Sequence, residues 1–512
     1  MRERITYLIH PGSDFDPSDI EITSTTLAVS GLNADKEHQI TIGFEQLPKE
    51  IWQVLKDLHE LHIRWASPRP YSTVAPFVSR VSPGLHISLT PRNDSTSNSD
   101  LPALCPLLKT LFSRTLKCTS LNTFTTPPIL SGRFSSSASK TFYAPVFTLA
   151  DLSAYIVRAI CPEENFHCRL LAHDLRTAVS LDADYSAISH ALVLRALYPA
   201  PPSAPAEPAW YETHHASSPG ALEVGILRNE PATEPAALSF GGYLAVVGKD
   251  TKAVQTLFSA PSRHHPLPTT SKFTPSLPPP QGLHPSLRLS FPLSALTPPD
   301  RSCRLHTALT LPSALFVDPY PFADALYAGT HGVAALHSLA GATDLEAPDW
   351  VVEQWGQAAL FELAPPDPED LTGSEKGVWN ATLPLHARYL PPRPPGANST
   401  GPSAAVPLPA PAVFWACPAE EGTKFAAGPF DRTDLGYDGL FGTRTMFYHF
   451  TPASVEGRAG LVGVVRVPVL DTAMGGLVAW GTAAVVMLGA GWVFWTLLGG
   501  LGVKRVGRAK VE

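Results

Sequence analysis

Residues 472–503 read TAMGGLVAWGTAAVVMLGAGWVFWTLLGGLGV and contain no ionisable side chain. A bilayer core needs about 20 apolar residues in a helix, and a single segment in lipid must be helical to satisfy its backbone polar groups. We therefore expect a transmembrane segment at 471–503, with its hydrocarbon-spanning core at 477–498. A buried core helix is the alternative, but it fits poorly with the basic tail that follows at once: Lys504, Arg505, Arg508 and Lys510.

Small residues recur along this segment at Gly475, Ala479, Ala483 and Gly491. Small side chains at such spacing let a second membrane helix approach closely, so these four residues are candidate partner contacts. The alternative is that glycine and alanine are simply common in membrane helices.

The composition describes a folded body rather than a disordered chain, since 44% of the 512 residues are hydrophobic. The 53 prolines favour short strands and turns, because proline lacks a backbone donor and has a fixed φ. A formal net charge of −7 argues against nucleic acid as a partner, which requires a basic surface.

The N-terminal apolar run ends at Pro11 and is too short for a signal-peptide core. The basic tail favours a cytosolic C-terminus, which implies a large lumenal N-terminal part. A tail-anchored protein with a cytosolic body is the alternative topology.

Cysteines and glycosylation sequons bear on this choice. Cys161 and Cys168 are close enough in sequence for a small disulfide loop, and Cys303 with Cys417 could link the C-terminal half; reduced buried thiols are the alternative. Three sequons favour a lumenal body, and they begin at Asn93, Asn380 and Asn398.

The apolar pattern and the positions of proline and glycine divide the body into two regions separated by linkers. Residues 1–198 predict an α+β lumenal region, with strands near 4–10, 20–22, 27–29 and 39–44 and helices near 47–62, 104–116, 149–161 and 185–198. Residues 199–285 predict Pro-rich linkers that flank a short β segment. Residues 286–470 contain short apolar runs between Pro and Gly turns, which predict a mainly antiparallel β-sandwich. Residues 504–512 form a short basic cytosolic tail.

No catalytic motif is present among these residues. The stretch His59 to Trp65 lacks the H-E-x-x-H spacing of metalloproteases, and no C-x-x-C pair indicates zinc. Asp182-Ala183-Asp184 superficially matches a metal-binding D-x-D, but acids just before a predicted helix are expected as caps. The histidine pairs 214–215 and 264–265 fall in predicted Pro-rich loops. We therefore expect no catalytic residue, no metal site and no cofactor.

Several strings resemble the PIG-X family in its fungal, Pbn-type form. They are Leu58-His59-Glu60-Leu61-His62-Ile63-Arg64-Trp65, Ala387-Arg388-Tyr389-Leu390-Pro391-Pro392 and Pro429-Phe430-Asp431-Arg432-Thr433-Asp434-Leu435-Gly436-Tyr437-Asp438-Gly439-Leu440-Phe441-Gly442. Together with the single C-terminal span, the resemblance covers nearly the whole chain.

The resemblance implies a single-pass glycoprotein of the endoplasmic reticulum membrane that acts in GPI-anchor biosynthesis. Its role would be the non-catalytic, stabilising subunit of GPI mannosyltransferase I, with a contribution to protein folding in the lumen. The multi-pass partner, of PIG-M type, would transfer the first mannose from dolichol-phosphate-mannose to the glucosaminyl-phosphatidylinositol intermediate. A lumenal membrane-anchored chaperone with several clients is the alternative.

Two further features could serve such an accessory subunit. Arg388 and Tyr389 are candidate partner contacts, because Arg and Tyr are enriched at binding hot spots. The alternative is that Tyr389 packs in the sandwich and Arg388 pairs with an acid. Asp434 and Asp438 could bind a cation or a lipid headgroup, but a tight turn fits the surrounding glycines better.

Overall fold

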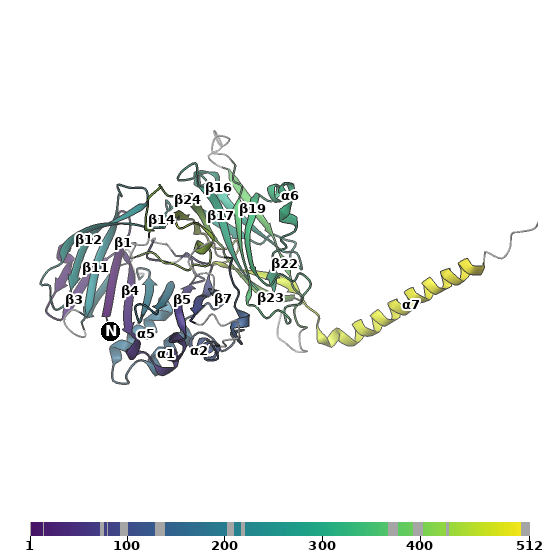
Figure 1. Cartoon of the computed structure of the whole chain (residues 1–512), viewed down its shortest axis with the longest axis horizontal. Coiled ribbons are helices and arrows are strands. Elements are labelled where there is room, and N and C mark those ends of the chain that lie inside the picture. The colour runs from purple at the N-terminus through teal and green to yellow at the C-terminus, as the bar shows by residue number, and fades with distance from the viewer. Residues whose placement is uncertain are drawn as a thin grey trace, which may run out of the picture.

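The protein consists of two β-rich units followed by a long C-terminal helix (Figure 1). The computed structural model describes residues 2–13, 15–71, 76–78, 80–92, 101–128, 139–201, 209–216, 221–366, 377–392, 403–425 and 430–502. Strands dominate both units, and most strand pairs are antiparallel, as expected from the sequence.

A ten-stranded sheet forms the first unit, in the order β13-β12-β11-β1-β4-β9-β8-β5-β6-β7. Its strands are β1 (Arg2–Ile9), β4 (Ala34–Gly43), β5 (Leu58–Ala66), β6 (Gly84–Pro91), β7 (Lys140–Ala144), β8 (Ser180–Ser186), β9 (Ala191–Tyr198), β11 (Leu222–Glu230), β12 (Ala237–Val246) and β13 (Val254–Pro261). A smaller sheet, β10-β3-β2, joins β10 (Trp210–His215), β3 (Thr26–Leu32) and β2 (Ile20–Ile22).

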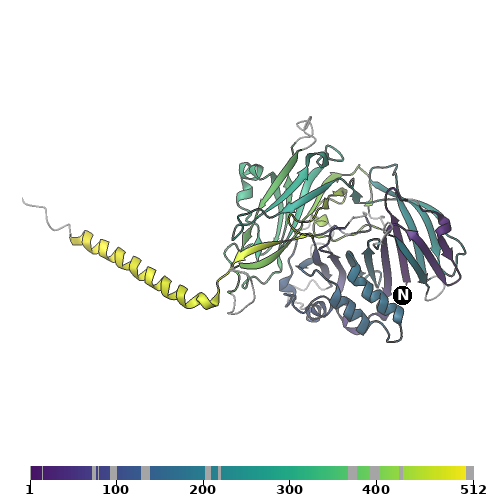
Figure 2. The same cartoon turned by 180° about the vertical axis from the view of Figure 1, so that it is seen from behind.

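Four helices gather on one side of the first unit (Figures 1 and 2). They are α1 (Lys49–Leu55), α2 (Leu104–Leu111), α4 (Ala150–Ala159) and α5 (Phe166–Asp174). Leu55, Leu108 and Tyr155 of these helices are buried in one core with strand residues such as Ile63 and Ile87. This apolar contact fixes the helices against the sheet, because buried hydrophobic area is the main stabilising term.

The second unit is a sandwich of two main sheets. The six-stranded sheet runs β14-β25-β24-β17-β20-β19, and the four-stranded sheet runs β21-β16-β15-β26. Phe291 of β16, Leu309 of β17 and Phe361 of β20 lie in the core between them. The strands are β14 (His264–Pro266), β15 (Lys272–Ser276), β16 (Ser286–Pro292), β17 (Arg304–Pro312), β19 (Val333–Gly341), β20 (Gly356–Leu363), β21 (Val378–Pro384), β24 (Ala412–Pro418), β25 (Thr445–His449) and β26 (Thr451–Pro452).

Two short pairs and one helix complete the second unit. β18 (Leu315–Phe316) pairs with β22 (His386–Ala387), and β23 (Ser403–Pro409) pairs with β27 (Val462–Pro468). Helix α6 (Ala325–Thr330) precedes β19. An antiparallel-rich sandwich is thus present over residues 286–470 as expected, but it begins before the predicted boundary, because β14 and β15 belong to its sheets.

One predicted helix is wrong, and another is shorter than predicted. Residues 185–198 contain the end of β8, a turn and β9, and these two strands form a hairpin that pairs from Ser180 with Leu197 to Ser186 with Ala191. A continuous apolar run matches a helical period and a strand period equally, so the sequence pattern could not separate them. The helix predicted at 47–62 ends at Leu55, and β5 begins at Leu58.

The linkers predicted for residues 199–285 are also wrong for most of that range. β11 pairs with the N-terminal β1 in parallel, and β12 and β13 extend the same sheet. Gly242 allows close packing of β12 on β11: its φ is +155°, and a Cβ there would lie 2.0 Å from the Ile226 carbonyl oxygen. Both histidine pairs lie in strands, β10 and β14, rather than in loops.

Helix α7 (Gly475–Gly502) follows β27 after a short connection and extends away from the body (Figures 1 and 2). A 3-10 turn, Thr472–Met474, leads into it and is capped by Asp471, whose carboxylate accepts a hydrogen bond from the Ala473 amide at 2.9 Å.

Candidate functional site

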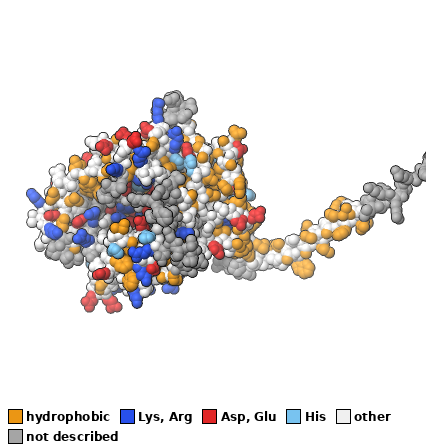
Figure 3. Space-filling model, in the orientation of Figure 1, with side chains coloured by type: hydrophobic (Ala, Val, Ile, Leu, Met, Phe, Trp, Pro, Cys, Tyr) orange, Lys and Arg blue, Asp and Glu red, His pale blue; other side chains and the backbone are white. Residues whose placement is uncertain are grey.

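Helix α7 has the length and composition needed to cross a membrane. An 18-residue window within Thr472–Leu498 has a mean hydropathy of 1.8, and none of that window is buried against the body. Hydrophobic side chains follow its described length in the space-filling view (Figure 3). An apolar helix left uncovered over this length requires either lipid or another apolar helix around it.

The small residues of α7 contact nothing else in the described chain. A Cβ added to Gly475 or Gly491 would have no atom within 4 Å. At 100° per residue, steps of four drift around the helix, so Gly491 lies about 160° from Gly475. Gly475, Ala479 and Ala483 therefore share one face near the body, and Gly491 lies on another. Exposed Met487 occupies the intervening step.

Arg388 and Tyr389 have opposite surroundings. Arg388 is buried, its guanidinium donates to the carbonyl oxygens of Ala347 (2.7 Å) and Ala342 (3.3 Å), and it lies over the Phe316 ring at 4.5 Å. Both interpretations of Arg388 are thus corrected, because its partners are carbonyls and it is not accessible to another protein. Tyr389 is 64% exposed and stays available as a contact.

The six cysteines form three disulfides. Cys161 bonds to Cys168 between α4 and α5, and Cys303 bonds to Cys417 between β17 and β24. A third bond, which the sequence did not suggest, joins Cys105 and Cys118. Of the sequons, Asn380 is exposed on β21 and accepts a hydrogen bond from Ser290 at 2.7 Å, while Asn93 and Asn398 lie outside the described residues.

A buried ion-pair network joins the two units. It consists of Glu37, His62, Arg64, Asp182, Asp184, Arg195, Arg432 and Asp434. Arg432 arrives from the second unit and binds Glu37 of β4 at 2.5 Å and Asp182 of β8 at 3.0 Å. Its Nη2 also donates to the Phe77 carbonyl at 2.9 Å. One arginine thus holds two strands of the first sheet to the loop that precedes β25.

Asp184 and His62 form the more exposed side of this network. Asp184 accepts from Arg64 and Arg195 at 2.6 Å each and from His62 Nδ1 at 2.8 Å. Burial opposes ionisation, but the Arg64 charge and the His62 hydrogen bond hold the pKa of Asp184 well below its usual range. Burial would lower the pKa of His62, yet its hydrogen bond to Asp184 and the nearby carboxylates of Glu60 and Asp434 raise that pKa to about 9. His62 is therefore an imidazolium at neutral pH.

The network corrects the interpretation of Asp182 and Asp184 as helix caps. Both lie in strand β8, and arginines occupy their carboxylates. They are not free to hold the metal of a nucleotide sugar, because the positive charge they would bind is already supplied by protein.

The loop after Phe430 forms a tight turn, which is the interpretation that the sequence favoured for Asp434 and Asp438 over a cation or headgroup site. Asp438 accepts from the backbone amides of Asp434 (2.9 Å) and Leu435 (2.8 Å). Asp434 has φ +57°, a conformation that Asp tolerates better than most residues. The turn directs Tyr437 onto the six-stranded sheet, where its ring stacks on that of Phe414 in β24 with the ring centroids 4.7 Å apart.

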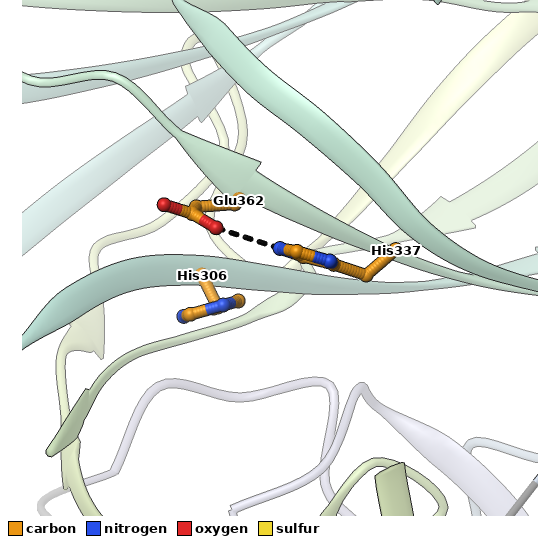
Figure 4. Close-up of side chains that lie close together, drawn as sticks. All are labelled: His306, His337 and Glu362. Atoms are coloured by element: carbon orange, nitrogen blue, oxygen red, sulfur yellow. Dashed lines mark hydrogen bonds and ion pairs between the residues drawn. The ribbon is translucent and has the colours of Figure 1, made fainter. Parts of the chain in front are cut away.

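Two groups of three residues have metal-ligating atoms within 4.8 Å of one another in the described part of the chain. The first is Glu60, His62 and Asp434, in which protonated His62 has no lone pair to offer. The second is His306, His337 and Glu362, on neighbouring strands of the six-stranded sheet (Figure 4). No sequence motif indicated the second group, because its members are far apart along the chain.

Comparisons with known proteins match almost the whole chain. A family model described as PIG-X / PBN1 matches residues 280–498. Protein pbn1 of Emericella nidulans is 42% identical over 515 residues, covering 97% of this chain and 95% of that protein. Protein pbn1 of Aspergillus fumigatus is 43% identical over 511 residues, with 97% and 95% covered. Protein pbn1 of Neurospora crassa is 37% identical over 503 residues, with 98% and 95% covered.

Proposed function

The chain belongs to the PIG-X/PBN1 family, and on that premise we propose that it is the non-catalytic, stabilising subunit of GPI mannosyltransferase I in the endoplasmic reticulum membrane. In this role it binds a multi-pass catalytic subunit of PIG-M type and keeps it folded, so that the first mannose reaches the glucosaminyl-phosphatidylinositol intermediate. A ligand that binds only the native state of its partner stabilises that partner by mass action.

The observation that carries the proposal is the uncovered helix α7 beside a well-packed body. Nothing in the described chain covers its face of small residues at Gly475, Ala479 and Ala483, whereas the body is closed by two cores and the buried ion-pair network. Helices associate in membranes through such small-residue faces. Tyr389, exposed two residues after β22, is a second contact that the body could offer.

A lumenal body and a cytosolic tail are part of the proposal. Three disulfides favour an oxidising compartment, and exposed Asn380 leaves its sequon accessible to the glycosylation machinery. We expect endoglycosidase to shift the mobility of the protein, and Asn380→Gln to reduce that shift. Protease added outside sealed microsomes should spare the body; digestion of a glycan-free body would refute the lumenal topology.

The helix contact has its own test. Ala479→Ile combined with Ala483→Ile should lower co-purification of the catalytic subunit, because two branched side chains hold the helices apart. The matched pair of single variants is Ala483→Ile, on this face, and Ala484→Ile, which adds the same atoms about 140° around the helix from Ala479. Both proteins should stay in the membrane fraction. Equal recovery of the partner with both would exclude the helix as the contact, and capture of many unrelated proteins would favour the chaperone alternative.

A further inference from the structure

Three strands of the six-stranded sheet bring two histidines and a glutamate together on one face (Figure 4). His306 on β17 lies directly opposite Glu362 on β20 in the strand register. His337 lies on β19, between Leu336 and Ser338, where the register with β20 shifts. Such an irregularity re-aims a side chain, and here His337 Nε2 lies 2.6 Å from Glu362 Oε2.

His306 has one nitrogen committed and one available. Its Nδ1 lies 3.0 Å from the Arg304 carbonyl oxygen, which can only accept, so Nδ1 carries the proton and Nε2 keeps its lone pair. The His306 ring itself is buried. A histidine whose other nitrogen donates to a backbone carbonyl is the usual arrangement of a metal ligand.

Glu362 supplies the negative charge of the group. Its Oε2 faces His337, and its Oε1 lies 4.0 Å from Arg304 Nε. The Arg304 side chain is 60% exposed, so it can withdraw into solvent if a cation replaces it. His337 is 45% exposed, and the group is therefore open to ions from solution.

We propose that His306, His337 and Glu362 form a binding site for a divalent transition-metal ion of the zinc class. Two imidazole nitrogens and one carboxylate oxygen are a donor set that zinc accepts, and three protein ligands leave a fourth position for water or another donor. Magnesium and calcium are disfavoured, because they require oxygen ligands.

The geometry allows such an ion with movements of side chains alone. Metal–ligand bonds of zinc put neighbouring donor atoms about 3.3 Å apart in a tetrahedron. The ligand atoms here lie within 4.8 Å of one another, and the 2.6 Å contact of His337 with Glu362 would lengthen as the ion enters. The ion would tie β19, at the edge of the sheet, to β20 and β17.

The test is zinc titration of the full-length protein in detergent by isothermal calorimetry, with a purification tag that contains no histidine. We expect one zinc per chain and no saturable binding of magnesium. His337→Ala and Glu362→Gln should each weaken zinc binding at least about tenfold. Mutating a residue that merely hydrogen-bonds to a metal ligand already lowers metal affinity about tenfold, and these two residues are direct ligands. The control is His284→Ala, which breaks the contact of His284 with His386 (3.1 Å) and should change affinity less than about twofold.

Absence of saturable zinc binding to the wild-type chain would overturn the proposal. So would equal affinity in His337→Ala and wild type, with circular dichroism showing that both are folded. If His337→Ala did not fold, Glu362→Gln would decide the question, because it keeps the shape of the side chain and removes the charge. Cobalt provides an independent readout: visible absorption bands of tetrahedral Co²⁺ should appear in the wild-type protein and be lost in Glu362→Gln.

Discussion

His62 and His306 both lie on strands near the junction of the two units, and each has a glutamate and a third ligand-type residue close by. The surroundings separate them. Carboxylates surround His62, which raises its pKa to about 9, whereas His306 faces a carbonyl and apolar rings and its pKa falls to about 4. The first histidine is a cation inside an ion-pair network, and the second is a neutral ring with a lone pair. The neighbours of a histidine thus decide whether it serves as a cation that joins the two units, like His62, or as a neutral metal ligand, like His306.

The largest loss of stability should come from removing Arg432 from the buried ion-pair network. Arg432→Met removes the buried arginine that pairs with Glu37 and Asp182, and Asp182 keeps Arg64 at 3.6 Å. The substitution should lower the free energy of unfolding by about 3–5 kcal/mol, because Glu37 stays buried after its ion pair is broken. Urea denaturation in mild detergent measures it. The control is Arg4→Met, which removes an exposed ion pair with Glu223 and should cost less than about 1 kcal/mol. An equal loss of unfolding free energy in both variants would contradict a stabilising role for the buried ion-pair network.

The protonated state of His62 should appear in the pH dependence of stability. Its folded pKa of about 9 exceeds its ordinary value of 6.5, so its contribution is full below about pH 6.5 and is lost as the pH rises through 9. The difference in unfolding free energy between wild type and His62→Gln should therefore shrink by up to about 3 kcal/mol over that range. A difference that stays constant with pH would mean that His62 is neutral in the fold.

The two histidine groups should respond to different variants. His62→Gln should leave zinc affinity within about twofold of wild type, while His337→Ala should change the unfolding free energy of the zinc-free protein by less than about 1 kcal/mol. Calorimetry and urea denaturation of the same preparations measure both. Loss of zinc binding in His62→Gln would place the ion at the junction and reverse the comparison.

The smallest effect is expected at Asp434, which is partly exposed and lies 3.1 Å from His62 Nε2. Asp434→Asn keeps a side chain that tolerates φ +57° but removes one charge that raises the His62 pKa. Stability should fall by less than about 1 kcal/mol, and the pH at which the His62 contribution is lost should decrease. The same pH series checks this, and an increase would contradict the proposed role of the charge.

The sequence predicted what depends on a single segment. Helix α7 follows from an uncharged apolar run alone, and the sandwich follows from short apolar runs between Pro and Gly turns. The strand pairing of the first unit is harder to predict from sequence, because β1 pairs in parallel with β11. In this pair Arg4 contacts Glu223, which is 219 residues away. No local pattern records such a pairing, so residues 222–261 looked like a short insert rather than the edge of the sheet.

The site depends on distant pairs even more strongly. Asp182 and Arg432 are 250 residues apart, and the Asp182-Ala183-Asp184 string alone gave no hint that arginines would neutralise it. His337 and Glu362 are 25 residues apart, and a bulge brings them together. The string around Arg432 indicates a family resemblance and, through Asp434 and Asp438, a turn, but it predicts no physical role for the arginine.

The distance between Asp182 and Arg432 also sets an order of events during synthesis. A ribosome adds about 5–20 residues per second, so β8 exists for roughly 12–50 seconds before its arginine is made. During this interval the Glu37 carboxylate must stay hydrated or be shielded by other proteins, and Asp182 lacks one of its two arginines. The first unit can close fully only after Arg432 has been added, when fewer than 100 residues remain to be translated. Completion of the body and emergence of α7 are thereby adjacent steps in the life of the chain.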